Sequence, residues 1–150
     1  MTLVFFTQII QIMANVLGSI NWLSVLVAFL VYFMLGALWY MRLFPKLYKV
    51  SLGKADETLQ NQSPLYIVGP GICVLAVVVA SAVLLYWLGI NSYADALLFA
   101  LLVGVGFLVA NTTNIAINPN IPRPLLYSLI TSSYHLVGIT LTCLVLVAMK

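Results

Sequence analysis

The sequence predicts an all-α membrane protein in which four spanning helices form one bundle. Of its 150 residues, 64% are hydrophobic and only 6% are charged, whereas a soluble domain has roughly 25% charged residues. Four apolar runs are each about twenty residues or longer, which at 1.5 Å per residue crosses a hydrocarbon core of roughly 30 Å. Because water cannot solvate a surface of this composition, lipid must be the main solvent.

The first segment, residues 1–19, is apolar but short for a span. Gln8, Gln11 and Asn15 recur at i, i+3 and i+7, so they share one face of a helix. This pattern favours an interfacial helix that lies on the membrane. A signal peptide fits less well, since no basic region precedes the apolar stretch, and a start at Met13 is a further alternative.

Aromatic and capping residues mark the ends of the spans. Trp22 and Trp39 lie at opposite ends of the first span, where their rings reach the headgroups, and Ser19 can cap its start. Ser92 and Asp95 form a capping box that opens the third span. The spans are expected at residues 21–43, 64–88, 93–117 and 124–149, within one domain that covers residues 20–150.

The basic residues predict the orientation in the membrane. Four of the six lie at the end of the first span or in the loop at residues 44–63, and Arg123 lies in the loop at residues 118–123. Because cytoplasmic loops are enriched in Lys and Arg, we expect both loops in the cytoplasm and both termini outside. A lipid-headgroup or partner site in the 44–63 loop is the alternative explanation. We expect no nucleic-acid partner.

Polar residues in the third and fourth spans are the candidate site. In an antiparallel hairpin that turns near residues 119–122, Asn111 faces Thr131 and Asn114 faces Ser128. One interpretation is a ladder of interhelical hydrogen bonds that sets the helix register. The other is a polar path or pocket near the bilayer midplane, since an intramembrane histidine is a functional candidate. The candidates are His135, Asn111, Asn114, Thr131 and Tyr134.

The sequence shows no pattern typical of a catalytic or metal site. His135 is the only histidine, and no Asp or Glu is spaced to ligate a metal with it or to orient its ring. Ser132 and Ser133 are near in sequence, but residues two or three apart on a helix rarely direct a nucleophile at a base. Cys73 and Cys143 lie inside apolar runs, as small buried hydrophobes do. We therefore expect no cofactor and no metal, and a non-enzymatic protein is favoured.

Small residues predict close helix packing. Ala96, Ala100 and Gly104 form one stripe on the third span at i, i+4 and i+8, and Gly138 pairs with Thr142 on the fourth. Such stripes let helices approach closely where lipid removes the hydrophobic driving force. Since four short helices enclose little interior, we expect these stripes to contact further copies of the chain, in a homo-oligomer, or other membrane subunits.

Three short motifs resemble a known family. They are Asn21-Trp22 at the start of the first span, Gly36-Ala37-Leu38-Trp39-Tyr40 near its end, and Tyr134-His135 in the last span. In these residues the chain is similar to small bacterial four-helix membrane proteins known only as a domain of unknown function. The resemblance covers about residues 20–149 and implies a four-span fold in the bacterial inner membrane, with no assigned activity. Met41-Arg42 departs from the pattern, because the family usually has Ser-Pro after Trp-Tyr.

Together these features predict an oligomerising or accessory structural subunit of a membrane assembly, surrounded by the lipid bilayer. The alternative is an oligomeric transporter or channel for small solutes or ions, with a polar path between the third and fourth spans. The two differ in one physical respect, because only the second requires water to reach His135.

Overall fold

The computed structural model describes residues 2–57 and 63–150, and these residues form helices and turns without a strand. Four continuous helices are long and apolar enough to cross a membrane: Trp22–Leu43, Leu65–Trp87, Tyr93–Ala116 and Pro124–Ala148. The prediction of an all-α, four-span protein is thereby confirmed. In order, the elements are α1 (Thr2–Ser19), α2 (Trp22–Leu38), η1 (Trp39–Leu43), α3 (Pro45–Ser51), α4 (Leu65–Trp87), α5 (Tyr93–Val103), η2 (Gly104–Val109), α6 (Ala110–Ala116) and α7 (Pro124–Ala148), where η1 and η2 are π-helical.

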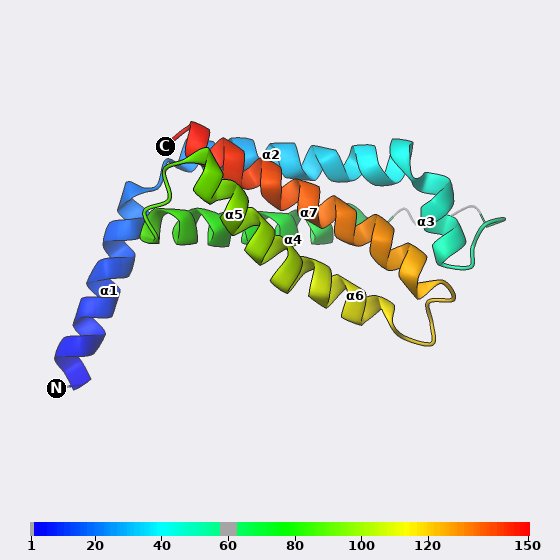
Figure 1. The fold of residues 1–150 in the computed structure, drawn as a ribbon, viewed down its shortest axis with the longest axis horizontal. Helices are drawn as coiled ribbons and strands as arrows, with labels where there is room; N and C mark the ends of the chain where they lie inside the picture. Colours follow the sequence, from blue (N-terminus) through cyan, green and yellow to red (C-terminus); the bar gives the residue numbers. More distant parts are fainter. Residues whose placement is uncertain (1, 58–62) are drawn as a thin grey trace.

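α7 is the central helix of the bundle (Figure 1). It packs against α2 and α4, against α5, η2 and α6, and near its start against α3, whereas α4 contacts the α5–α6 arm only slightly. Within the four spans, 56% of α7 is buried, compared with 22% of each of the other three. The polar residues of α7 are therefore the ones that the fold encloses.

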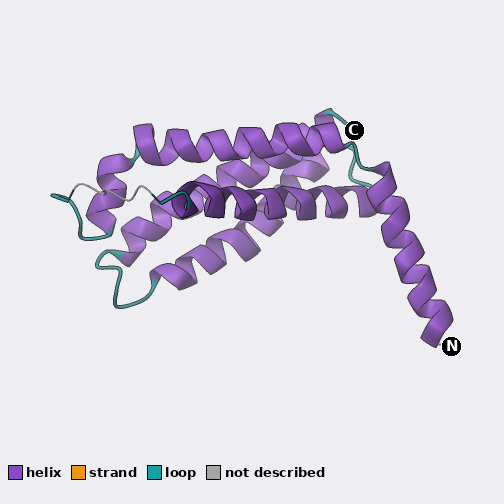
Figure 2. Cartoon of the chain, turned by 180° about the vertical axis from the view of Figure 1, so that it is seen from behind, coloured by secondary structure: helices purple, strands orange, loops and turns teal. Residues whose placement is uncertain are grey.

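α1 leaves the bundle at the end where α2 begins and extends across the direction of the other helices (Figures 1 and 2). It contacts α4, where Ile9, Ile12 and Met13 line a shallow hollow together with Trp87. Other apolar side chains of this helix, such as Phe6, are exposed. That α1 lies on the membrane surface stays a prediction.

Small residues allow the close helix contacts inside the chain. Ala96 and Ala100 are fully buried in the face of α5 that packs against α7, and a Cβ on Gly104 would lie 2.7 Å from a side-chain carbon of α7. At Gly138 a Cβ would lie 2.0 Å from the ring of Tyr32. The predicted packing role of these residues is therefore intramolecular. The expectation that the Ala96-Ala100-Gly104 stripe contacts a second copy is wrong, because α7 already occupies it.

Asn21 joins three segments at the end of the bundle where α2 begins. Its Oδ1 accepts hydrogen bonds from the backbone N–H groups of Leu23 at 3.1 Å and Ser24 at 3.4 Å, so Asn21 is the N-cap of α2. Ser19, the expected cap, instead ends α1. The Asn21 Nδ2 donates to the Met149 carbonyl at 2.7 Å, and its backbone N–H donates to the Tyr86 hydroxyl at 3.1 Å. One side chain thus caps α2 and holds the end of α7.

Replacing Asn21 with alanine is expected to lower the free energy of unfolding by about 2 kcal/mol, because the cap and the bond to Met149 are each worth about 1 kcal/mol. Asn21→Asp keeps an acceptor for the cap but has no donor for the Met149 carbonyl, so about half of that loss is expected. Denaturant titration of the purified protein in mild detergent measures both values. Asn120→Ala, in an exposed turn, is the control. Equal losses for the alanine and aspartate variants would contradict the capping role.

The turn between α4 and α5 is held by the predicted capping box and by a lysine. Ser92 Oγ accepts from the Asp95 backbone N–H at 3.1 Å and donates to the Asp95 carboxylate at 2.6 Å. Lys150 Nζ lies 2.8 Å from Asn91 Oδ1 and 4.6 Å from the centre of the Tyr86 ring. The Lys150 ammonium group is therefore stabilised by Asn91 in this turn and by the ring of Tyr86.

Candidate functional site

Tyr134 occupies the contact between α2 and α7. A Cβ on Gly36 would lie 2.9 Å from the Tyr134 hydroxyl oxygen, so a larger residue at Gly36 would displace the tyrosine. The Tyr134 ring packs against Tyr32, Tyr40 and Trp39, with centroid separations of 5.3, 5.4 and 6.4 Å. These separations are typical of favourable aromatic pairs. Residues almost one hundred positions apart in the sequence therefore form one packed unit.

The aromatic contacts continue toward α3. Tyr40 meets Tyr48 edge-on at 4.9 Å, and Tyr48 reaches Tyr127 on α7 at 5.8 Å. The Trp39 Nε1–H donates to the Ile130 carbonyl at 3.0 Å, which joins η1 to α7. Because Tyr48 is partly buried and lies near Tyr127 and Tyr40, its pKa is raised well above the ordinary value, so the phenol stays neutral. We call this set the aromatic cluster; its members are Tyr32, Trp39, Tyr40, Tyr48, Tyr127, Tyr134 and His135.

His135 pairs with α2 and not with the third span. Its Nδ1 lies 2.9 Å from the Tyr32 hydroxyl, which also lies 3.4 Å from the His135 carbonyl. Either Tyr32 donates to an unprotonated Nδ1, or a protonated Nδ1 donates to Tyr32 while the phenol proton turns to the carbonyl. The Nε2 makes no hydrogen bond with any residue that the structure describes. No carboxylate orients the imidazole, because the three acids are exposed near the ends of the bundle: Asp56, Glu57 and Asp95.

Hydroxyl groups, not amides, join the third span to α7. Thr113 Oγ1 lies 2.6 Å from Ser128 Oγ. Asn111 and Asn114 are exposed, and within residues 2–57 and 63–150 their side chains make no hydrogen bond. The expected pairing of Asn111 with Thr131 and of Asn114 with Ser128 is therefore wrong. The observed pair, Thr113 with Ser128, differs from the predicted pair, Asn114 with Ser128, by one residue along the third span. The rotation of that helix about its axis, however, places both amides on its outer surface.

The π-helical segment η2 explains this rotation. A π-helix closes its hydrogen bonds at i→i+5, so it contains an extra residue compared with an α-helical turn. Since each residue turns an α-helix by about 100°, one extra residue rotates α6 by that angle relative to α5. The face that carries Asn111 and Asn114 turns away from α7, while Thr113 and the fully buried Ala116 turn toward it.

Thr131 lies on α7 beside the aromatic cluster. Its Oγ1 is buried and makes no hydrogen bond of good geometry within the described chain, although it lies close enough to the Tyr40 hydroxyl for a weak one. A buried hydroxyl without a partner costs about 1–3 kcal/mol. Thr131 Oγ1 and His135 Nε2 are therefore the polar atoms of this region that are still free to form a hydrogen bond with a water or a polar ligand.

The structure brings together three of the five predicted polar candidates, because Thr131, Tyr134 and His135 gather where α7 meets α2. Sequence reasoning missed the other aromatic residues that surround them. A signal for them was present, since Tyr32, Gly36 and Tyr40 recur at i, i+4 and i+8 and so share one helix face. The missed members of the aromatic cluster are Tyr32, Trp39, Tyr40, Tyr48 and Tyr127.

The aromatic cluster is closely packed and has no metal-binding group beside it in the described part of the chain. No group of three or more His, Cys, Asp or Glu side chains that could hold a metal occurs in the described part of the chain. Both cysteines are free thiols, with Cys73 exposed and Cys143 buried. Two surface hollows lie at α3 and beside α1, and neither is lined by a residue of the aromatic cluster.

The fold and this site define a four-span helical membrane protein whose central helix carries a buried tyrosine and a neighbouring histidine. The chain belongs to DUF1761, a family of proteins of unknown function, whose model matches residues 23–147. The resemblance to a family without an assigned function is thereby confirmed. The match begins after Asn21-Trp22 and does not include α1. No curated protein and no solved structure matches the chain.

Proposed function

We propose that this protein is a self-associating structural subunit of a membrane assembly in the bacterial inner membrane. The observation that carries the proposal is the surface of the third span that points away from α7. Gly106, Ala110, Asn111 and Asn114 are exposed there, on a helix long and apolar enough to cross a membrane. A Cβ on Gly106 would meet nothing within 4 Å. We call these four residues the outer face.

An amide on a lipid-facing helix favours a partner helix. With Thr113 opposite Ser128, Asn111 lies near the level of Ile130, which at 1.5 Å per residue is about 9 Å from the start of α7. At this depth water is scarce, and an unpaired polar group is costly. An asparagine amide both donates and accepts, so the outer face of a second copy can satisfy it about a two-fold axis.

The small residues of the outer face support the same conclusion. Gly106 and Ala110 are four residues apart, so they lie on one side of the helix. Small residues at this spacing let two backbones approach closely, which strengthens packing and interhelical hydrogen bonds in lipid. The outer face thus combines close approach with self-complementary polar groups.

The distribution of charge supports both loops in the cytoplasm and both termini outside. The 44–57 and 117–123 connections lie at one end of the bundle, opposite the start of α2 and the end of α7 (Figure 1). Cytoplasmic ends of membrane helices are enriched in Lys and Arg. Lys150, at the other end, is held by the α4–α5 turn. Five of the six basic residues are at the loop end: Arg42, Lys46, Lys49, Lys54 and Arg123.

The carrier alternative receives less support from this geometry. The polar candidates that would line its path diverge, because Asn111 and Asn114 are exposed on the outer surface while His135 bonds to Tyr32 on α2. Thr131 is buried. A path between the third and fourth spans of one chain would therefore be lined by hydroxyls alone, without the amides or the imidazole.

The double variant Asn111→Leu/Asn114→Leu tests the structural proposal. Interhelical hydrogen bonds in lipid contribute about 0.6–1.7 kcal/mol each, so self-association is expected to weaken about tenfold or more. Energy transfer between labelled copies in vesicles, measured against the protein-to-lipid ratio, gives the dimer affinity. The matched control is Gln8→Leu/Gln11→Leu, which removes two amides from α1.

The unfolding free energy separates assembly from folding in this experiment. Asn111 and Asn114 make no hydrogen bond within the described chain, so the double variant should unfold like the unmodified protein. A protein that stays monomeric at every protein-to-lipid ratio, or a double variant that associates as tightly as the control, would refute the proposal.

A further inference from the structure

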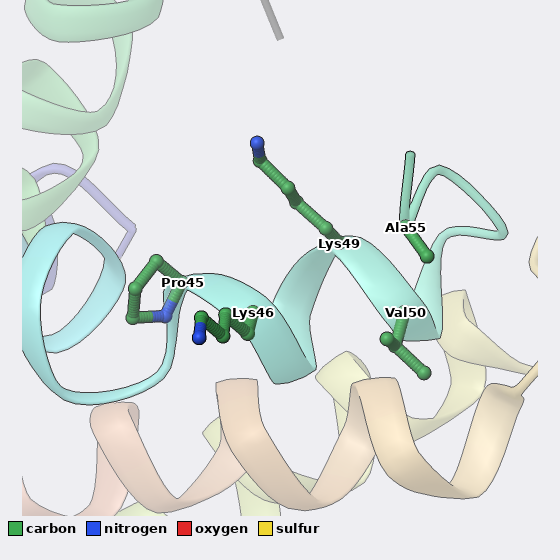
Figure 3. Close-up of a pocket in the computed structure, with 5 residues that line it drawn as sticks. All are labelled: Pro45, Lys46, Lys49, Val50 and Ala55. Atoms are coloured by element: carbon green, nitrogen blue, oxygen red, sulfur yellow. The ribbon is translucent and has the colours of Figure 1, made fainter. Parts of the chain in front are cut away.

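A hollow on α3 lies where the first span ends. It has a volume of about 390 Å³ and is lined by Pro45, Lys46, Lys49, Val50 and Ala55 (Figure 3). This volume falls within the ~300–1,000 Å³ range of small-molecule sites. We call it the α3 hollow. It is formed by different elements from those of the outer face, so a ligand bound in it would not require self-association.

The two lysines of the α3 hollow are not neutralised by the protein. Lys46 is exposed and makes no hydrogen bond or ion pair with the described residues. Lys49 donates to a backbone carbonyl, that of Glu57, at 3.2 Å. The Glu57 carboxylate lies instead 3.5 Å from Lys54. The α3 hollow therefore presents two ammonium groups, and no carboxylate lines it.

Two arginines lie in segments that adjoin α3. The Arg123 backbone N–H donates to the Ser51 carbonyl at 3.3 Å, which attaches the loop before α7 to the end of α3. Arg42 lies in η1, directly before α3. Both belong to the same positively charged end of the bundle, where the overall potential favours anions, but neither lines the α3 hollow.

The surroundings of the α3 hollow place it at the boundary between lipid and water. The span Trp22–Leu43 ends two residues before Pro45. Leu43 and Leu47 are large apolar side chains that remain exposed, at 53% and 47%. Leu43 belongs to the span and is covered by lipid in any case. A soluble anion would leave Leu47 uncovered, whereas a phospholipid would cover it with its acyl chains while its phosphate reaches the lysines.

We propose that the α3 hollow binds the phosphate of an anionic phospholipid, with Lys46 and Lys49 as its cationic ligands and Val50 and Ala55 as apolar walls. Lysine binds phosphate as a compact charge, and basic groups at the cytoplasmic membrane surface attract anionic lipids. The lipid would attach α3 to the membrane surface on the side with most of the basic residues.

The test compares two double variants that each remove two positive charges at the same end of the bundle. Lys46→Gln/Lys49→Gln removes the charges that line the α3 hollow, whereas Lys54→Gln/Arg123→Gln removes two that do not. Native mass spectrometry of the full chain in mild detergent, with phosphatidylglycerol or phosphatidylcholine added, gives the apparent lipid affinities. Thermal unfolding in zwitterionic detergent shows that both double variants are folded.

The unmodified protein is expected to retain phosphatidylglycerol in preference to phosphatidylcholine. The Lys46/Lys49 variant should lose about tenfold or more in apparent affinity for phosphatidylglycerol, and the control about twofold or less. Equal losses in the two double variants would show diffuse attraction and overturn the site. Equal retention of phosphatidylcholine, or displacement of phosphatidylglycerol by millimolar inorganic phosphate, would overturn the assignment to an anionic lipid.

Discussion

Gly138→Ala is expected to destabilise the protein by about 3 kcal/mol, near the upper end of the usual range for overpacking a core. The added Cβ would lie 2.0 Å from Tyr32 Cε2 and 2.4 Å from two further ring carbons. Tyr32 is fully buried and its hydroxyl bonds to His135, so the ring cannot move aside without breaking that pair. Denaturant unfolding in detergent, followed by helical circular dichroism, measures the loss.

Two comparisons make this prediction specific to the clash. Gly106→Ala adds the same methyl group to a spanning helix where nothing lies within 4 Å, so no loss of stability is expected. In the Gly138→Ala background, Tyr32→Leu should recover part of the lost stability, because the smaller side chain vacates the space. A Gly138→Ala variant as stable as the unmodified protein would refute the close contact between α2 and α7.

Tyr134→Ala is expected to cost about 3–5 kcal/mol, the range for removing a large aromatic side chain from a core. The ring contacts Tyr32, Trp39 and Tyr40, so its loss opens a cavity that three neighbours line. Tyr134→Phe should cost less than about 1 kcal/mol, because the hydroxyl makes no hydrogen bond within the described chain. The same unfolding measurement in detergent compares the two variants.

An exposed tyrosine provides the control for the Tyr134 prediction. Tyr93 is 57% exposed at the start of α5, so Tyr93→Ala should leave the unfolding free energy almost unchanged. If Tyr134→Phe were as damaging as Tyr134→Ala, the hydroxyl would have a role beyond packing. That result would indicate that the Tyr134 hydroxyl has a polar partner and that the aromatic cluster can act as a binding site.

The four-span architecture could be predicted from the sequence because the features that determine it, apolar runs and helix caps, are local in the chain. Apolar runs of sufficient length must cross a bilayer, and capping groups act within three or four residues of the helix start, as Ser92 and Asp95 do. Part of the site was accessible for the same reason. Tyr134 and His135 are an adjacent polar aromatic pair in the middle of the last span, and the structure places both in the aromatic cluster.

The partners of the polar residues were not accessible from the sequence. The predicted pairing of Asn111 and Asn114 with α7 assumed an uninterrupted α-helix. The extra residue in η2 rotates the turns that follow it. Assigning residues to helix faces at 3.6 residues per turn is therefore correct before Gly104 and wrong after Val109. The alternative of a polar path placed His135 beside the third span, whereas its hydrogen-bond partner, Tyr32, is on the first.

The sequence by itself determined the number of spans, the end of the bundle that carries the positive charge, and the residues able to make polar contacts. Hydrocarbon thickness and charge act along the chain, so they can be inferred without knowing how the helices pack. Only the tertiary structure decided that His135 bonds to Tyr32 and that Asn111 and Asn114 face outward. The rotation of each helix about its axis depends on η2 and on the close approach at Gly104 and Gly138, which exist only once the helices pack around α7.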